Sequence, residues 1–188
     1  MRIGILGGTF NPIHIGHLIL AEESREKLGL DKIIFVPTNL PPHKGDAEVA
    51  AASKRLAMLR IALAGNRYFS VSDVEIRRKG FSYTIETIRE LEKLYPKQEL
   101  FFITGSDLLK YLDDWKDLNK IIKMVKFVVA RRPGYPLEKI PSYISTLQIR
   151  AVDVSAFEIR SRIRRRKSFR YLVPEKVYKY IKEKKLYL

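Results

Sequence analysis

Short apolar runs that alternate with helix-like segments are the feature that most constrains how this chain can fold. The runs are bounded by Gly, Pro or polar loops, which is typical of buried strands. Predicted strands span residues 2–6, 32–36, 69–76, 100–104, 126–130 and 147–152. Predicted helices span residues 17–28, 53–64, 82–94, 157–165 and 174–184. This alternation favours an α/β fold with a mostly parallel sheet and helices on both of its faces.

The 188 residues contain no repeat, low-complexity stretch or obvious linker, so we expect one domain over residues 1–188. Its last part, about 153–188, is predicted to be helical. No apolar run approaches the ~18 residues of a membrane helix, and residues 3–6 are too short for a signal peptide. There is no Cys, which excludes disulfides and thiolate metal sites. A cytoplasmic protein is therefore expected.

The chain carries 36 Lys and Arg against 21 Asp and Glu, a formal net charge of +15. Such an excess indicates a polyanionic partner or a surface charged for solubility. It suits a small substrate with several phosphates as well as it suits nucleic acid, and nucleic acid is not the partner that we expect.

The loop Gly7–His17 follows the first predicted strand and leads into a helix. It matches neither a P-loop nor a dinucleotide fingerprint, but its glycines let the backbone approach a ligand, and the helix start attracts phosphate. His14 and His17 share a helical face, and Gly16 is expected to leave space there for a ligand. Surface imidazoles are the alternative. With only His43 as a third imidazole, we expect no metal site made of protein side chains.

Four loops with unusual residues all follow predicted strands. They span residues 7–17, 37–44, 105–107 and 131–134. In a parallel sheet the loops that leave the carboxyl ends of the strands converge on one edge, where ligands bind. We therefore expect these four loops to form one site.

The first of these loops resembles a known family. Gly8-Thr9-Phe10-Asn11-Pro12 and His14-Ile15-Gly16-His17 resemble the (H/T)xGH nucleotidyltransferases, and further motifs resemble bacterial nicotinate-nucleotide adenylyltransferases. These further motifs are Phe35-Val36-Pro37, Pro41-Pro42-His43-Lys44, Ser82-Tyr83-Thr84, residues 102–107, Trp115, Arg132-Pro133-Gly134, Ser155 to Arg160 and residues 170–174. The resemblance covers nearly the whole chain in the family's order. It implies a Rossmann-like fold of the nucleotidyltransferase type.

The resemblance also implies a reaction. ATP and nicotinate mononucleotide would give nicotinate adenine dinucleotide and pyrophosphate, a step of NAD biosynthesis, with Mg²⁺ accompanying the ATP. The acceptor phosphate is already ionised, so no general base is needed. The expected partners are ATP and nicotinate mononucleotide, and a homo-oligomer is left open.

The family's functional residues can be carried over to matching positions. The resemblance implies that His14, His17 and Arg160 are catalytic. It implies ATP contacts from Gly8, Thr9, Phe10, His14, His17, Gly105, Asp107, Ser155, Ile159 and Arg160. Arg160 could otherwise be one of many solvated arginines, and Asp107 a simple helix cap.

On the acceptor side the resemblance implies contacts from Asn39, Lys44, Thr84, Trp115 and Arg132. Thr84 stands at a predicted helix start, whose N–H groups favour a carboxylate over a neutral amide. Trp115 could stack on a pyridine ring or fill the core, and Arg132 could be a surface arginine.

Two positions depart from the family pattern. Asn11 stands where the family usually has Asp, and Ala156 and Phe157 replace two hydroxyl residues. The alternatives are therefore an adenylyltransferase for nicotinamide mononucleotide or phosphopantetheine, and a non-catalytic protein that binds nucleotides or nucleic acid.

Overall fold

A computed structural model describes residues 1–39, 49–78, 80–131, 140–150 and 152–188. Its centre is a sheet of six strands in the order β3-β2-β1-β4-β5-β6, with every pair of neighbours parallel. The strands are β1 Arg2–Gly8, β2 Lys32–Pro37, β3 Phe69–Val71, β4 Glu99–Gly105, β5 Lys126–Arg131 and β6 Ile144–Gln148. The predicted parallel sheet is confirmed.

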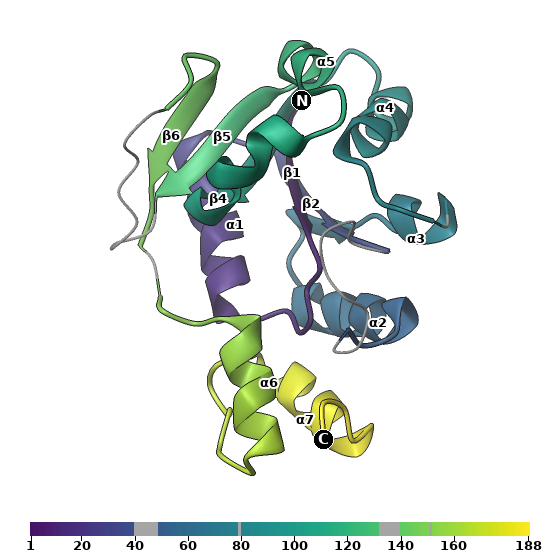
Figure 1. Cartoon of the computed structure of the whole chain (residues 1–188), viewed down its shortest axis with the longest axis vertical. Helices are drawn as coiled ribbons and strands as arrows, with labels where there is room; N and C mark the ends of the chain where they lie inside the picture. The colour runs from purple at the N-terminus through teal and green to yellow at the C-terminus, as the bar shows by residue number, and fades with distance from the viewer. Residues whose placement is uncertain (40–48, 79, 132–139, 151) are drawn as a thin grey trace.

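Helices cover both faces of the sheet (Figure 1). One face packs against α1 Ile15–Lys27 and α2 Ala52–Leu63, and the other against α3 Val74–Arg78, α4 Thr84–Leu94, η2 Ser106–Asp114 and α5 Leu118–Met124. Neighbouring strand residues alternate between the two cores: Ile33 and Phe35 of β2 belong to the first, and Ile34 and Val36 to the second. Burial on both faces explains why the strands read as continuous apolar runs.

The C-terminal helices are α6 Ala156–Arg164 and α7 Glu175–Glu183. Their buried residues, Ile159 and Ile163 of α6 and Val177 and Ile181 of α7, belong to the same core cluster as α1 and α2. This shared core supports the prediction of one domain, which stays a prediction. Among the described helices, none has both the length and the apolarity needed to cross a bilayer.

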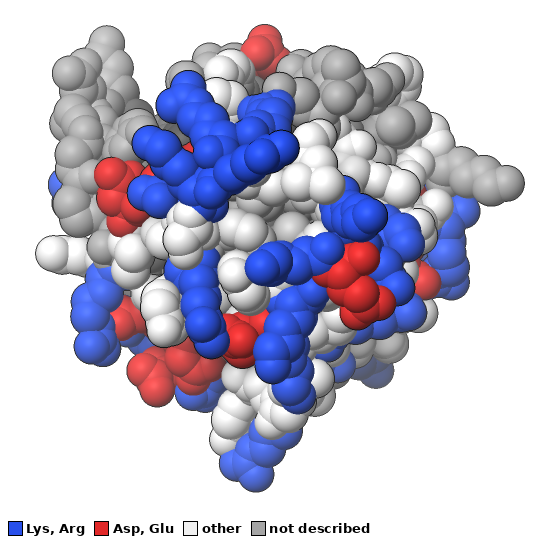
Figure 2. All heavy atoms as spheres, turned by 90° about the horizontal axis from the view of Figure 1, so that it is seen from below, with Lys and Arg blue, Asp and Glu red and all other residues white. Residues whose placement is uncertain are grey.

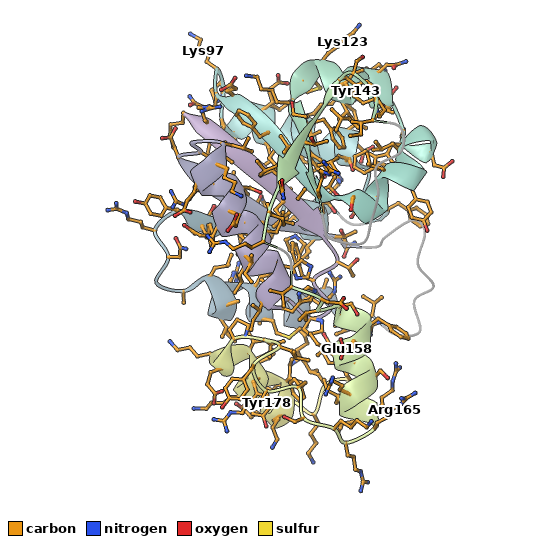
Figure 3. All side chains as sticks on the ribbon, turned by 90° about the vertical axis from the view of Figure 1, so that its left-hand side faces the viewer. Lys97, Lys123, Tyr143, Glu158, Arg165 and Tyr178 are labelled. Atoms are coloured by element: carbon orange, nitrogen blue, oxygen red, sulfur yellow. The ribbon has the colours of Figure 1, made fainter. Side chains whose placement is uncertain are left out.

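The two ends of the molecule differ, as Figure 3 shows. Lys97, Lys123 and Tyr143, which precede β4, β5 and β6, mark the end where strands begin. Glu158, Arg165 and Tyr178 mark the opposite end, formed by α6 and α7. The carboxyl ends of the strands therefore point toward the C-terminal helices.

Several predicted boundaries are wrong. The strand predicted over 69–76 ends at Val71, because the carbonyl of Asp73 accepts from the N–H of Arg77 and begins α3. The strand predicted over 147–152 is β6, Ile144–Gln148, an edge strand that is mostly exposed and so lacks a clear apolar pattern. The short helices α3, η2 and α5 were not predicted. Pro174 is the N-cap of α7 rather than its first helical residue.

Candidate active site

The candidate site lies at the carboxyl edge of the sheet, where β1 and β4 are neighbours. Gly8 at the end of β1 is paired with Pro37 at the end of β2, and Gly105 at the end of β4 with Ala130. The chain leaves β1 toward the face covered by α1, and leaves β4 toward the face covered by η2. Such a topological switch point is where open α/β sheets bind ligands.

The loop after β1 is buried rather than solvated. Phe10, with a φ of 47°, is 2% exposed, and its ring lies 5.0 Å from that of His17 and 5.8 Å from that of Phe35. A Cβ at Gly8 would approach the Phe10 ring to 3.2 Å, so this glycine makes room for the ring. Packing of Phe10 into the core thus fixes the path of the loop.

His14 and His17 lie together at the start of α1. His14 is the N-cap residue and is 3% exposed, and the two ring centroids are 3.7 Å apart. The backbone N–H of His14 donates to His17 Nδ1 at 3.2 Å. Because Nδ1 accepts this hydrogen bond, a neutral His17 carries its proton on Nε2, which makes Nε2 a donor.

The space beside Gly16 is used differently from our expectation. A Cβ at Gly16 would meet Nδ1 of His14 at 3.1 Å and Cε1 at 3.2 Å. The glycine therefore accommodates the His14 ring, and the prediction that it leaves room for a ligand at this point is wrong. Any larger residue would push His14 out of its N-cap position.

Arg55 of α2 is the principal residue that the sequence did not reveal. It is 1% exposed, and its guanidinium donates only to backbone carbonyls in the hydrogen bonds identified. The acceptors are Thr9 at 2.8 Å, Thr38 at 2.6 Å, Asn39 at 3.0 Å and Ala50 at 2.8 Å. One side chain thus joins the loop after β1 to the loop after β2.

Burial lowers the pKa of Arg55, yet a guanidinium stays charged because its normal pKa is so high. Its hydrogen-bonding partners are neutral carbonyls, so the positive charge is not cancelled by a neighbouring carboxylate in these contacts. The charge lies beneath the loop that carries His14 and favours anions there. A buried arginine on a helix has the same sequence signature as a solvated one, which is why the sequence did not single it out.

The C-terminal helices reach the same loop through Arg160. Its Nη1 donates to the carbonyl of Asn11 at 2.9 Å. Ser155 is the N-cap of α6, and its hydroxyl accepts from the N–H of Glu158 at 3.1 Å. Ile159 is fully buried in the core. The structure therefore brings Arg160 and the N-terminus of α6 toward the loop after β1.

The positions that depart from the family pattern have defined environments. The Asn11 side-chain oxygen accepts from the N–H of Ala50 at 3.1 Å, which ties this loop to the start of α2. Phe157 is 64% exposed and lies on the surface of α6. Tyr187 near the C-terminus is close enough to Arg55 and Arg160 for both charges to act on its pKa, although burial is the larger effect and raises it.

The predicted ribose contacts lie at the end of β4. Gly105 is its last residue and the N-cap of η2. The backbone of Asp107 lies in the first turn of η2, and its side chain is outside the description.

On the acceptor side the structure places three predicted residues around the start of α4. Thr84 is the first residue of this helix, and Asn39 follows β2 and donates from its backbone N–H to Ser82 Oγ at 3.0 Å. Trp115 is partly buried, with its ring 5.5 Å from Phe102 and 5.8 Å from Phe127. The predicted contacts of Lys44 and Arg132 lie outside the described residues.

The basic charge is unevenly distributed. Figure 2, seen from the end formed by the C-terminal helices, shows Lys and Arg over much of this face, with carboxylates between them. Arg162 pairs with Glu158 at 2.8 Å, and Arg170 lies 3.4 Å from Glu175. This interleaving differs from an unbroken basic surface for a long polyanion.

The arrangement can bind two phosphorylated molecules side by side. Imidazoles, a helix N-terminus and arginines meet at the β1 loop, which suits a polyphosphate. The start of α4 and an aromatic ring lie on the other side of β1, which suits a planar ring with an anionic group.

Comparison with known proteins agrees with this geometry. Residues 5–162 match the cytidylyltransferase-like family model. Proteins named "Probable nicotinate-nucleotide adenylyltransferase" are 42% identical over 99% of this chain and 95% of the relative in Desulfitobacterium hafniense, and 44% identical over 100% and 99% in Exiguobacterium sibiricum.

A solved structure shares the fold at lower identity. The Plasmodium falciparum nicotinic acid mononucleotide adenylyltransferase complexed with NaAD superposes with a TM-score of 0.82 at 18% identity, covering 99% of this chain and 97% of that one. The chain described here belongs to the cytidylyltransferase-like family and, within it, to the nicotinate-nucleotide adenylyltransferases.

Proposed function

We propose that this protein transfers the adenylyl group of ATP to nicotinate mononucleotide, giving nicotinate adenine dinucleotide and pyrophosphate. The observation that carries the proposal is the stacked pair His14 and His17 at the N-terminus of α1, at the switch point of the sheet. Sequence relatives over the full length support the same acceptor.

In this reaction a phosphate oxygen of the mononucleotide attacks the α-phosphorus of ATP. The new P–O bond forms as the bond from the α-phosphorus to the bridging oxygen of the β-phosphate breaks, and pyrophosphate leaves with that electron pair. No proton must be removed from the attacking phosphate at neutral pH. Catalysis therefore consists of holding the two phosphates in line and stabilising the leaving charge.

The residues fall into two groups. His14, His17 and Arg160 would bind the polyphosphate, with Arg55 contributing charge from below. The backbone of Gly8–Phe10, Ser155 and Ile159 would lie along the nucleotide, and Gly105 and Asp107 would contact its ribose. Asn39, Lys44, Thr84, Trp115 and Arg132 would bind the acceptor.

The donors at the polyphosphate site are mainly nitrogen atoms, whereas Mg²⁺ prefers oxygen ligands. Among the described residues, no group of three His, Cys, Asp or Glu side chains is placed to hold a metal ion. The residues therefore fit ATP that enters as its Mg²⁺ complex, with the ion held by phosphate oxygens and water. The bound ion would neutralise charge on the leaving pyrophosphate.

The test is pyrophosphate release from ATP and Mg²⁺ with nicotinate mononucleotide, nicotinamide mononucleotide or phosphopantetheine as the acceptor. A clear preference for the nicotinate compound is expected. Release with another acceptor only would move the activity elsewhere in the family, and no release with any acceptor would favour a non-catalytic nucleotide-binding protein.

A further inference from the structure

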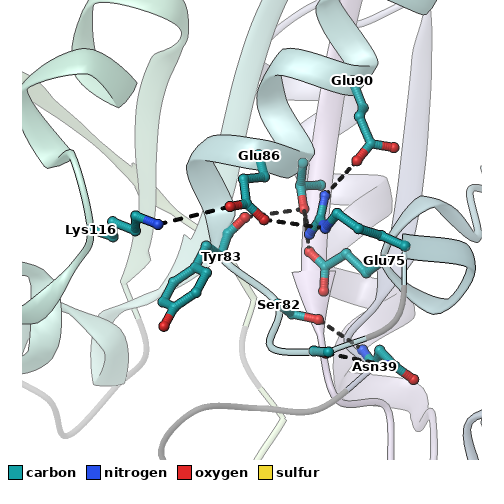
Figure 4. A network of polar contacts seen from close by, with 10 residues as sticks. Asn39, Glu75, Ser82, Tyr83, Glu86, Glu90 and Lys116 are labelled. Carbon is teal, nitrogen blue, oxygen red and sulfur yellow. Dashed lines mark hydrogen bonds and ion pairs between the residues drawn. The ribbon is translucent and has the colours of Figure 1, made fainter.

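A polar network lies behind the start of α4, where α3 packs against this helix (Figure 4). Its centre is Arg78 of α3, whose side chain is 19% exposed. The Nη1 atom of Arg78 donates to Glu90 at 2.7 Å, and Nη2 donates to Thr87 Oγ1 at 3.2 Å. The Nε atom lies 3.3 Å from Glu86 Oε2. One guanidinium therefore contacts three side chains on one face of α4.

The network continues into the predicted acceptor side. The Thr87 hydroxyl donates to Glu75 Oε1 at 2.6 Å. Lys116, which follows Trp115, lies 3.9 Å from Glu86 Oε1 and 4.6 Å from the centre of the Tyr83 ring. The position of the Trp115 backbone is thus linked to that of α4.

The turn before α4 is held from the other side. The N–H of Asn39 donates to Ser82 Oγ at 3.0 Å, and the Asn39 side chain donates to the carbonyl of Gly80 at 3.3 Å. The segment that leads to Thr84 is therefore fixed by β2 on one side and by α3 on the other.

Glu86 is the only acidic residue in the first turn of α4. Its negative charge cancels part of the attraction that the N–H groups of the helix start exert on an anion outside the helix. Arg78 and Lys116 both lie beside Glu86 and offset this charge. A carboxylate bound at Thr84 is repelled by an uncompensated Glu86, whereas a neutral amide is not.

We propose that Arg78 is a specificity-determining, positioning residue, which keeps the start of α4 selective for an acidic acceptor by neutralising Glu86 and fixing the helix. This inference rests on the proposed function. The ligand class that Arg78 selects is a pyridine nucleotide that carries a ring carboxylate, over the corresponding amide.

The experiment measures kcat/KM for nicotinate mononucleotide and for nicotinamide mononucleotide in Arg78→Gln and the wild type. The acid-to-amide ratio is expected to fall about fivefold, the size expected for partly exposed charges. The KM of the acid should account for the fall, while the KM of ATP stays unchanged. Adding Glu86→Gln to Arg78→Gln should restore the ratio, because the uncompensated charge is then removed.

Two further variants separate charge from folding. Arg78→Lys keeps the positive charge, and it should keep most of the ratio even if it melts at a lower temperature. Arg77→Gln is the matched control, because the neighbouring Arg77 is 66% exposed and pairs only with Asp73 among its identified ion pairs. Its ratio should equal that of the wild type.

The outcomes distinguish the two proposals. If the wild type prefers the acid and Arg78→Gln loses activity equally with both acceptors, Arg78 is merely structural and the inference is wrong. The same holds if Glu86→Gln does not restore the ratio. If the wild type does not turn over the acid, the proposed function fails and the inference fails with it.

Discussion

The two halves of the candidate site are held by different kinds of contact. At the loop after β1, Arg55 is 1% exposed and donates four hydrogen bonds to backbone carbonyls. At the start of α4, Arg78 is 19% exposed and contacts carboxylates that are 35% and 37% exposed. Buried bonds to the backbone fix a loop rigidly, whereas partly exposed ion pairs are weaker and are screened by salt.

This difference matches what each half has to recognise. A triphosphate is the same in every member of such a family, so a rigid loop serves it well. The acceptor ring differs by a single charged group, and charges near the start of α4 can discriminate it. We therefore expect substitutions at the β1 loop to abolish catalysis or destabilise the fold, and substitutions around α4 to change acceptor preference.

The largest effect is expected at His17. His17→Ala should lower kcat by about 100- to 1000-fold, the loss seen when one donor to a developing negative charge is removed. Circular dichroism should show that the fold is kept. His17→Asn, which retains a donor and an acceptor, should lose less. Near-normal turnover of the alanine variant would contradict the assignment of the phosphate site.

Arg55→Met tests the rigid half of the comparison. Four carbonyls lose their donor, and we expect the free energy of unfolding in urea to fall by about 2–4 kcal/mol. Arg60→Met on the exposed side of the same helix is the control and should stay within about 0.5 kcal/mol of the wild type. If both variants unfold alike, Arg55 does not hold the two loops together.

Trp115→Ala tests whether the aromatic ring on the acceptor side binds ligand as well as packing on Phe102. Loss of a stacking partner should raise the KM for nicotinate mononucleotide about tenfold and leave the KM for ATP unchanged. Trp115→Phe should retain most of the affinity. A lower melting temperature with an unchanged KM would make Trp115 a core residue only.

The smallest effect is a pH dependence at Glu75. Burial raises the pKa of this carboxyl, and hydrogen bonds from Thr87 and Ser82 offset only part of the rise. A raised folded-state pKa means that its stabilising contribution is present below the unfolded value, about 4.5, and is lost as pH rises through the folded value. Glu75→Gln stays neutral and keeps an acceptor for Thr87.

The measurement is the free energy of unfolding of both proteins between about pH 4 and 8. The stability of Glu75→Gln relative to the wild type should increase with pH and then level off. Glu183→Gln is a control of opposite sign, because its pairing with Lys184 lowers the pKa of Glu183. A difference between Glu75→Gln and the wild type that does not vary with pH would show that Glu75 is equally ionised in both states.

The sequence by itself determined the strand order along the chain, the buried character of the sheet and the position of the His14–His17 loop. Apolar runs, glycines and closely spaced histidines are local signals, so they can be read without the fold. Boundaries such as the end of β3 could not be predicted, because Val74 and Ile76 continue the apolar alternation although Asp73 has already begun a helix.

The tertiary structure alone decided which arginines matter. Arg55, Arg78 and Arg160 stand in helices whose other basic residues are exposed, and sequence gives them no distinguishing mark. Their roles come from partners 9 to 149 positions away, such as Thr9 for Arg55, Thr87 for Arg78 and Asn11 for Arg160. Long charged side chains act through what the fold places beside them, and that placement is fixed only when the sheet assembles.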